Sequence, residues 1–223
     1  MNSVLRIYPW RIPVRGVQLP FAWRTVERFS VNRGCQALLI SSAVALSWLL
    51  MMAVHELGHV LHGWMSGATV ACVVLPPVGF SRTDFAANPH PLFTAWGGVA
   101  WGCLLPLGLL AAVCLAARSY AYLAAWFAGF CLIANGVYLA CGIFLGGNAD
   151  DAGVILQHGG ARWQLLVFGI SAVGVGLYLW NGLGPHFGFG PAQGKVDRKS
   201  AVVVTAGLVV LVAVETILSF MTD

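Results

Sequence analysis

Three ionisable side chains stand close together in a segment that is otherwise apolar: His55, Glu56 and His59, in the pattern His-Glu-x-x-His. In an α-helix, residues four apart lie on one face, so both imidazoles would project in the same direction. This is the spacing that two ligands of a tetrahedral zinc site need. Glu56, rotated by about 100° around the helix, would then act on a water molecule as a general base instead of binding the metal.

These ionisable residues lie in an apolar segment, where the free energy of placing them is unfavourable. An ionisable group at the centre of a bilayer costs several kcal/mol, so three of them together need a reason. One alternative is that His55, Glu56 and His59 pair with each other between helices without any metal. The spacing favours the other explanation, an intramembrane metal site.

A catalytic zinc ion takes three protein ligands, so a third is required. Asp150 and Asp151 are the first candidates, because the small residues of the segment 146–153 (GGNADDAG) leave room for a metal to approach. The pair could instead cap a short following helix, or one carboxylate could cap while the other binds the metal. Glu215, in the last apolar run, is the second candidate and would complete a two-His, one-Glu site.

The other histidines are weaker candidates. His62 shares a helix face with His55 and His59, but one straight helix cannot wrap three ligands around one ion. We expect His62 to lie beside the site or to face a substrate. The remaining three fall between apolar runs, and we expect them to be solvated: His90, His158 and His186.

The composition is that of a membrane protein. Of the 223 residues, 59% are hydrophobic and only 9% are charged, and the mean hydropathy is +0.81. Soluble domains carry about 25% charged residues. Five apolar runs are long enough to span a bilayer, which takes about 20 residues: Gln36–Ser66, Pro91–Ala117, Tyr120–Leu145, Trp163–Leu183 and Ala201–Phe220. We therefore expect an all-α polytopic membrane protein with five transmembrane helices.

A small β element is expected after the first run. The segment Ala68–Phe85 carries Val70, Val73 and Val74 ahead of Pro76-Pro77, a pattern that favours one or two short strands. An edge strand of this kind could hold an extended substrate by β-addition. A loop or re-entrant hairpin that packs on the helices is the alternative.

Residues 1–35 differ from the rest of the chain, which forms the transmembrane domain, 36–223. Six arginines alternate with prolines and aromatic residues, and the segment lacks the short apolar core of a secretory signal peptide. This composition predicts an arm that lies on the anionic surface of a bilayer. Nucleic acid is set aside as a partner, because the net charge is only +4.

The six cysteines form no CxxC pair and indicate neither a disulfide framework nor a cysteine zinc site.

The distribution of lysine and arginine predicts the orientation. With a cytoplasmic N-terminus, ten of the twelve basic residues face the cytoplasm and only Arg82 and Arg162 face the outside. We therefore predict a multi-pass protein of the cell membrane with its N-terminus in the cytoplasm. His55, His59 and the Asp150–Asp151 pair then lie toward the same, outer face. Nothing in the sequence indicates an oligomeric state.

These residues resemble the site-2 protease family of intramembrane zinc metalloproteases over about Gln36 to Gly153. The segment 55–59 (HELGH) matches the helix that carries the family's zinc-binding histidines and catalytic glutamate. Trp96-Gly97-Gly98 is similar to the Gly-rich start of the second core helix. Asp151, followed by Ala152-Gly153, is similar to the family's Asp-Gly ligand motif, and Asp150 can be matched through Asn148-Ala149-Asp150.

The resemblance also implies a role for Asn135, which matches the family's asparagine that helps to hold an unwound substrate. The sequence departs from the family pattern because no proline follows Asn135, the spacing from Asn135 to Asp151 is longer, and Ala152 replaces a glycine. Family members normally place the site near the cytoplasm, whereas the charge distribution here places it near the outer face.

The resemblance implies a protease core at 36–153, one Zn²⁺ per chain and additional helices over 161–220. The implied activity is hydrolysis of a peptide bond in or beside the transmembrane segment of a membrane-protein substrate. The alternative is a non-catalytic membrane protein of the same fold, such as a metal-handling protein, a transporter or an inactive homologue. Glu56 favours hydrolysis, because metal transport does not require a glutamate between two histidine ligands.

Overall fold

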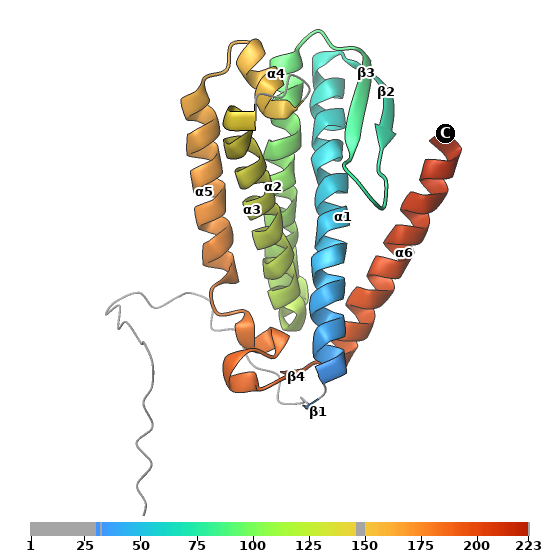
Figure 1. The fold of residues 1–223 in the computed structure, drawn as a ribbon, viewed down its shortest axis with the longest axis vertical. Helices are drawn as coiled ribbons and strands as arrows, with labels where there is room; N and C mark the ends of the chain where they lie inside the picture. The colour runs from blue at the N-terminus through green and yellow to red at the C-terminus, as the bar shows by residue number, and fades with distance from the viewer. Residues whose placement is uncertain (1–29, 32, 146–149, 223) are drawn as a thin grey trace, which may run out of the picture.

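The computed structural model describes residues 30–31, 33–145 and 150–222, and five long helices dominate it (Figure 1). Each of the five is long and apolar enough to cross a membrane. They are α1 (Arg33–Ser66), α2 (Pro91–Ala116), α3 (Ala121–Leu145), α5 (Arg162–Trp180) and α6 (Arg198–Thr222). The prediction of an all-α polytopic membrane protein is confirmed. Most of the predicted basic arm, residues 1–29 and 32, lies outside the described residues.

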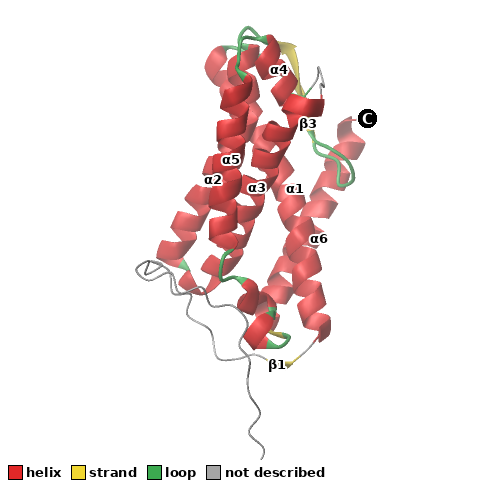
Figure 2. Ribbon diagram, turned by 60° about the vertical axis from the view of Figure 1, so that its left-hand side comes forward, coloured by secondary structure: helices red, strands yellow, loops and turns green. Residues whose placement is uncertain are grey.

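The helices form a bundle in which α1 holds a central position. α2 packs on one side of α1, α3 packs on α2, and α5 packs on α3 (Figures 1 and 2). α6 packs against α1 near the start of both helices and then leans away from it (Figure 1). Apolar side chains fill the space between them, as where Leu49 and Met52 of α1 meet Leu208 and Leu211 of α6.

A β-hairpin follows α1, as the valine-rich segment predicts. α1 ends at a left-handed glycine, Gly67, with φ 78°, a conformation that favours glycine over other residues. The strands β2 (Thr69–Val74) and β3 (Arg82–Ala87) then pair antiparallel and run alongside α1 (Figure 1). β3 extends two residues beyond the predicted segment. A second strand pair, β1 (Ser30–Val31) with β4 (Lys195–Val196), lies at the opposite end of the bundle.

A short helix, α4 (Asp151–Gln157), connects α3 and α5 at the same end of the bundle as the hairpin (Figure 1). Its apolar face is buried, with Ala152 and Ile155 packed into a cluster that includes Val99 of α2 and Leu139 of α3. This packing brings Asp151, the first residue of α4, beside His55 of α1 and Tyr138 of α3.

The expectation that His186 is solvated is wrong. The segment between the last two helices begins and ends three residues earlier than predicted, because α5 ends at Trp180 and α6 begins at Arg198. Between them, the 3₁₀ turn η2 (Gly184–Phe187) folds back onto α3, and the His186 ring stacks on Tyr122 with ring centroids 4.5 Å apart. This burial lowers the pKa of His186 below its ordinary value.

Candidate metal centre

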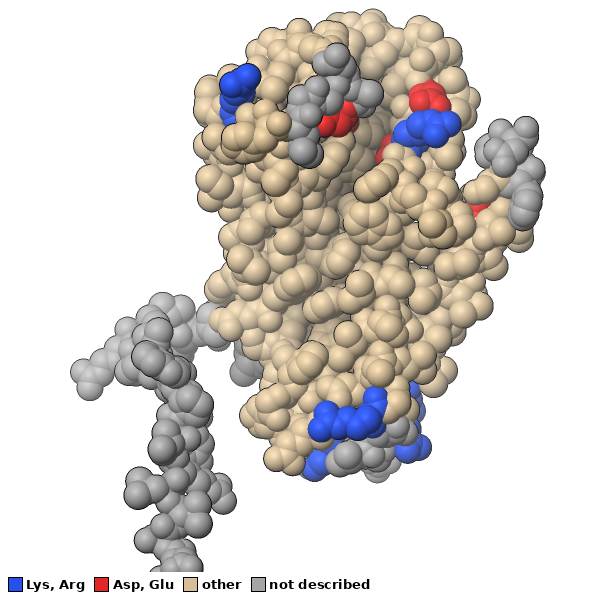
Figure 3. Space-filling view, in the orientation of Figure 1, with Lys and Arg blue, Asp and Glu red and all other residues tan. Residues whose placement is uncertain are grey.

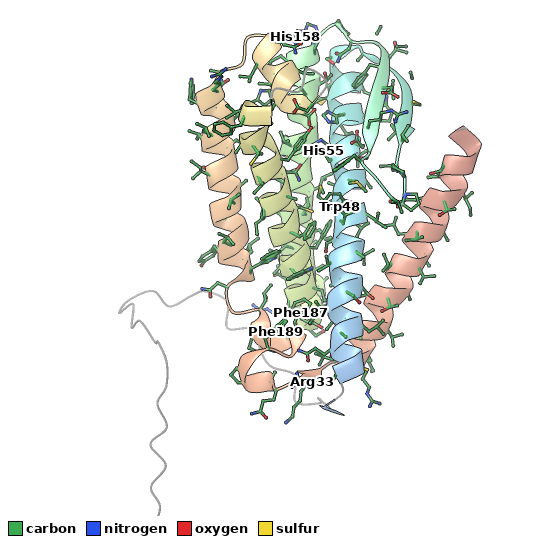
Figure 4. All side chains as sticks on the ribbon, viewed as in Figure 1. Arg33, Trp48, His55, His158, Phe187 and Phe189 are labelled. Atoms are coloured by element: carbon green, nitrogen blue, oxygen red, sulfur yellow. The ribbon has the colours of Figure 1, made fainter. Side chains whose placement is uncertain are left out.

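His55 and His59 point into the bundle, and their Nε2 atoms converge on one carboxylate. Figure 4 shows His55 in the half of α1 near α4 and the hairpin. The two Nε2 atoms are 3.0 Å apart. Asp151 of α4 places Oδ2 at 2.9 Å from His55 Nε2 and Oδ1 at 3.3 Å from His59 Nε2. All three residues are shielded from solvent, and their donor atoms form a group that could hold a metal ion.

The outer nitrogen of each ring is fixed by an oxygen acceptor. His55 Nδ1 lies 2.7 Å from Asn135 Oδ1 on α3, and His59 Nδ1 lies 2.8 Å from the Thr94 carbonyl oxygen on α2. Because an oxygen acceptor requires a hydrogen on Nδ1, each neutral ring presents a lone pair at Nε2. Two lone pairs and a carboxylate therefore face one another, an arrangement that a bound cation would stabilise.

Asp150 and Asp151 have different partners at the start of α4. Asp150 is the N-cap, and its Oδ1 accepts a hydrogen bond from the Gly153 N–H at 2.7 Å. Asp151 is directed at the two histidines. Of the arrangements that the sequence allows, the structure has the one in which one carboxylate caps and its neighbour completes the donor group.

Glycines let α2 approach the histidines closely. A Cβ atom on Gly98 would lie 2.6 Å from His55 Nε2 and closer still to His59 Nε2. Gly58, one turn after His55 on α1, lies equally close to the backbone of Gly97 and Gly98 on α2. The backbone of α2 therefore closes one side of the donor group, and a side chain at position 98 would intrude on it.

Glu56 is buried and points to the hairpin instead of joining the donor group. Its Oε1 accepts a hydrogen bond from Ser81 Oγ at 2.6 Å, and its Oε2 accepts one from Thr83 Oγ1 at 2.7 Å. Both carboxylate oxygens are thus fixed by hydroxyl groups at the start of β3.

Glu56 and the donor group line one cavity of about 950 Å³. Its polar wall includes Asn135 and Tyr138 of α3, and its apolar wall includes Trp48 and Phe80. On the face in Figure 3, acidic side chains gather at this end of the molecule, and most lysine and arginine side chains lie at the other. The donor group and the Glu56 carboxylate therefore lie beside the same cavity.

The other sequence candidates lie outside the donor group. Glu215 is buried in α6, and neither carboxylate oxygen has a hydrogen-bond partner among the described residues. The His62 ring stacks on Phe93, and its Nδ1 forms a hydrogen bond with the Phe93 carbonyl oxygen. His90 and His158 are exposed, as expected.

Asn135 is the residue that the resemblance assigns to the substrate. In the structure its Oδ1 accepts from His55, and its Nδ2 donates to the Cys131 carbonyl oxygen at 2.9 Å. It therefore orients His55 in the donor group, and its role toward a substrate stays a prediction.

Four residues at the site were not singled out from the sequence: Ser81, Thr83, Thr94 and Tyr138. Thr94 contributes through its backbone carbonyl, so its side chain gives no signal. Ser81 precedes β3 and lies two residues from Thr83, the spacing of one strand face, and Tyr138 follows Asn135 by one helical turn. Those spacings were signals available in the sequence.

Comparison with protein-family models, curated proteins and solved structures finds no match to this chain.

Proposed function

We propose that this protein is an intramembrane zinc metalloprotease that cleaves a peptide bond in or beside the transmembrane segment of another membrane protein. The observation that carries the proposal is the joint placement of His55, His59 and Asp151 with Glu56 in one cavity between apolar helices. Catalytic zinc sites take three protein ligands and keep one position open, and an adjacent unligated carboxylate can act as general base on the bound water.

The donor set suits zinc. Two imidazole nitrogens and a carboxylate are common zinc ligands, and a tetrahedral ion with bonds of about 2.0–2.1 Å separates its ligands by roughly 3.4 Å. The two Nε2 atoms here are 3.0 Å apart, and the nearest Asp151 oxygens are Oδ2 at 2.9 Å from His55 and Oδ1 at 3.3 Å from His59. Asn135 and the Thr94 carbonyl would hold the rings in the orientation that zinc binding needs.

Bound zinc would supply a Lewis acid that activates water and polarises a peptide carbonyl group. Glu56 would take the proton of the attacking water and pass it to the leaving amine. Ser81 and Thr83 would hold the carboxylate in one position, so that little reorganisation is needed when the proton moves.

The hairpin offers a place for an extended substrate. Within the described part of the chain, β2 and β3 pair only with each other, so β3 retains an unpaired edge. Residues at its start line the cavity. A substrate segment that unwinds from its helix could bond to this edge by β-addition, with its side chains against Trp48 and Phe80.

The decisive experiment compares the wild-type protein with Glu56→Gln in the host membrane. The substitution preserves size and removes the base, so zinc should stay at one ion per chain while cleavage stops. Full-length substrates should then accumulate, and their fragments should disappear from the membrane proteome.

A His55→Ala, His59→Ala double variant provides the matched control for the metal, because it should lose both zinc and cleavage. If Glu56→Gln binds zinc normally and no membrane protein changes length, the protease proposal fails. A non-catalytic, metal-handling role would then be the better explanation of the donor group.

A further inference from the structure

We infer that the Tyr138 hydroxyl group donates the hydrogen bond that stabilises the substrate carbonyl oxygen as negative charge grows on it. This inference rests on the proposed hydrolysis and adds a catalytic residue to it.

Tyr138 lies between the two elements that supply the metal ligands. Its ring packs edge-on against His55, with ring centroids 5.8 Å apart at an interplanar angle of 81°. Its hydroxyl oxygen accepts a hydrogen bond from the Asp151 backbone N–H at 3.2 Å. The phenol is thus anchored beside the donor group, and it lines the same cavity as Glu56.

The hydroxyl hydrogen of Tyr138 is available to a ligand. The bond from the Asp151 N–H uses a lone pair on the oxygen and leaves the O–H as a donor. The described residues offer this hydrogen no acceptor. An oxygen atom bound at the metal ligands would provide one.

The other hydroxyl groups near the donor group already have acceptors, and each amide group there has used one of its two hydrogens. The hydroxyl groups of Ser81 and Thr83 donate to Glu56. Asn135 donates to the Cys131 carbonyl oxygen, and Asn88 donates to Thr94 Oγ1. Trp48 carries an N–H, but it lies seven residues, about 10 Å along α1, from His55.

The assignment predicts that removal of the Tyr138 hydroxyl group lowers kcat strongly. Loss of a donor to the charged carbonyl oxygen typically lowers kcat by about 100- to 1,000-fold. In Tyr138→Phe we expect kcat to fall by about 100-fold with KM within threefold, since the bond strengthens only as charge develops. Zinc content should stay at the wild-type level.

The test uses the full-length protein in liposomes, with a substrate taken from the Glu56→Gln comparison. A second readout is binding of a phosphinic peptide with that substrate's sequence, because its tetrahedral, charged phosphorus group resembles the reacting carbonyl carbon. Tyr138→Phe should bind this probe at least tenfold more weakly. Tyr178→Phe, at an exposed position on α5, is the matched control and should change neither value.

The outcomes separate this inference from the proposed function. If Glu56→Gln abolishes cleavage while Tyr138→Phe retains kcat and phosphinic-peptide affinity, the tyrosine assignment is wrong and the protease proposal stands. If Tyr138→Phe loses zinc, the tyrosine positions Asp151 instead, and the assignment is again overturned. If Glu56→Gln changes no cleavage, both fail.

Discussion

Asp150 and Asp151 are adjacent carboxylates that point in different directions at the start of α4. Asp150 turns back to the Gly153 N–H, and Asp151 reaches across to His55 and His59 of α1. The backbone of α4 sets this difference, because the N-cap side chain must fold over the first turn while the next side chain is free to project outward.

Alanine substitutions should separate the two roles. Asp151→Ala should reduce bound zinc to below a tenth of the wild-type value, because only two protein ligands remain. Asp150→Ala should keep its zinc and lose about 1 kcal/mol of stability through the missing cap. Metal analysis and thermal unfolding of the purified variants measure both effects, and equal zinc retention in the two would contradict Asp151 as the third ligand.

Among the individual residues of the site, the sequence predicts those whose placement follows from helical spacing alone. His55, Glu56 and His59 are placed by the 3.6-residue period, whatever the rest of the fold does. The choice between Asp150 and Asp151 depends on the residue at which α4 begins and on how this helix packs, which the residue types alone do not give. The Thr94 contact is a backbone carbonyl and was therefore invisible in the residue types.

The crossing of α1 and α2 depends on the glycines between them. Gly98→Ala should abolish zinc binding, because its Cβ atom would collide with both Nε2 atoms. Gly108→Ala on the same helix is the matched control, since a Cβ atom there meets nothing within 4 Å. It should retain zinc and, by reducing chain entropy in the unfolded state, be equally or slightly more stable. Zinc retained in Gly98→Ala would contradict this account of the helix contact.

The hairpin acts on the site through hydroxyl groups. Thr83→Val keeps the side-chain shape and removes the donor to Glu56, so we expect cleavage to slow by about 10- to 100-fold, the value of a hydrogen bond to a charged group. Thr83→Ser restores a hydroxyl and should restore most of the rate. Fragment formation in liposomes measures the three rates, with zinc content unchanged throughout. If Thr83→Val and Thr83→Ser cleaved at equal rates, the Thr83 hydroxyl group would not position Glu56.

Elements with a strong local pattern were predicted correctly, and those held by tertiary contacts were not. Five apolar runs give five helices, and the valine-rich segment gives β2 and β3. The η2 turn has only glycine and proline as local signals. The turn buries His186 against Tyr122 of α3, a helix that is distant in the sequence, so this contact depends on tertiary packing.

The length of α1 sets the depth of the site in the membrane. α1 has 34 residues and is therefore about 51 Å long, whereas the hydrocarbon core is about 30 Å thick. His55 is 22 residues after Arg33, about 33 Å along the axis. With Arg33 at one interface, the metal ligands would lie near the opposite boundary, within reach of water.

The basic residues predict which boundary that is. We expect a cytoplasmic N-terminus, so His90→Cys should react with an impermeant thiol reagent from outside intact cells, in a variant without the six native cysteines. Lys199→Cys, exposed at the other end of the bundle, should react only after permeabilisation. The opposite labelling pattern would place the site at the cytoplasmic face, where the family resemblance expects it.

On the proposed function, the separation of the metal ligands along the chain has a consequence for biosynthesis. Asp151 follows His59 by 92 residues. A ribosome adds about 5–20 residues per second, so the last ligand is made about 5–18 s after the histidine motif. During that interval α1 and α2 can enter the bilayer with an incomplete ligand set. On the proposed function, the growing chain is inert toward neighbouring nascent membrane proteins until α4 has been made and has docked.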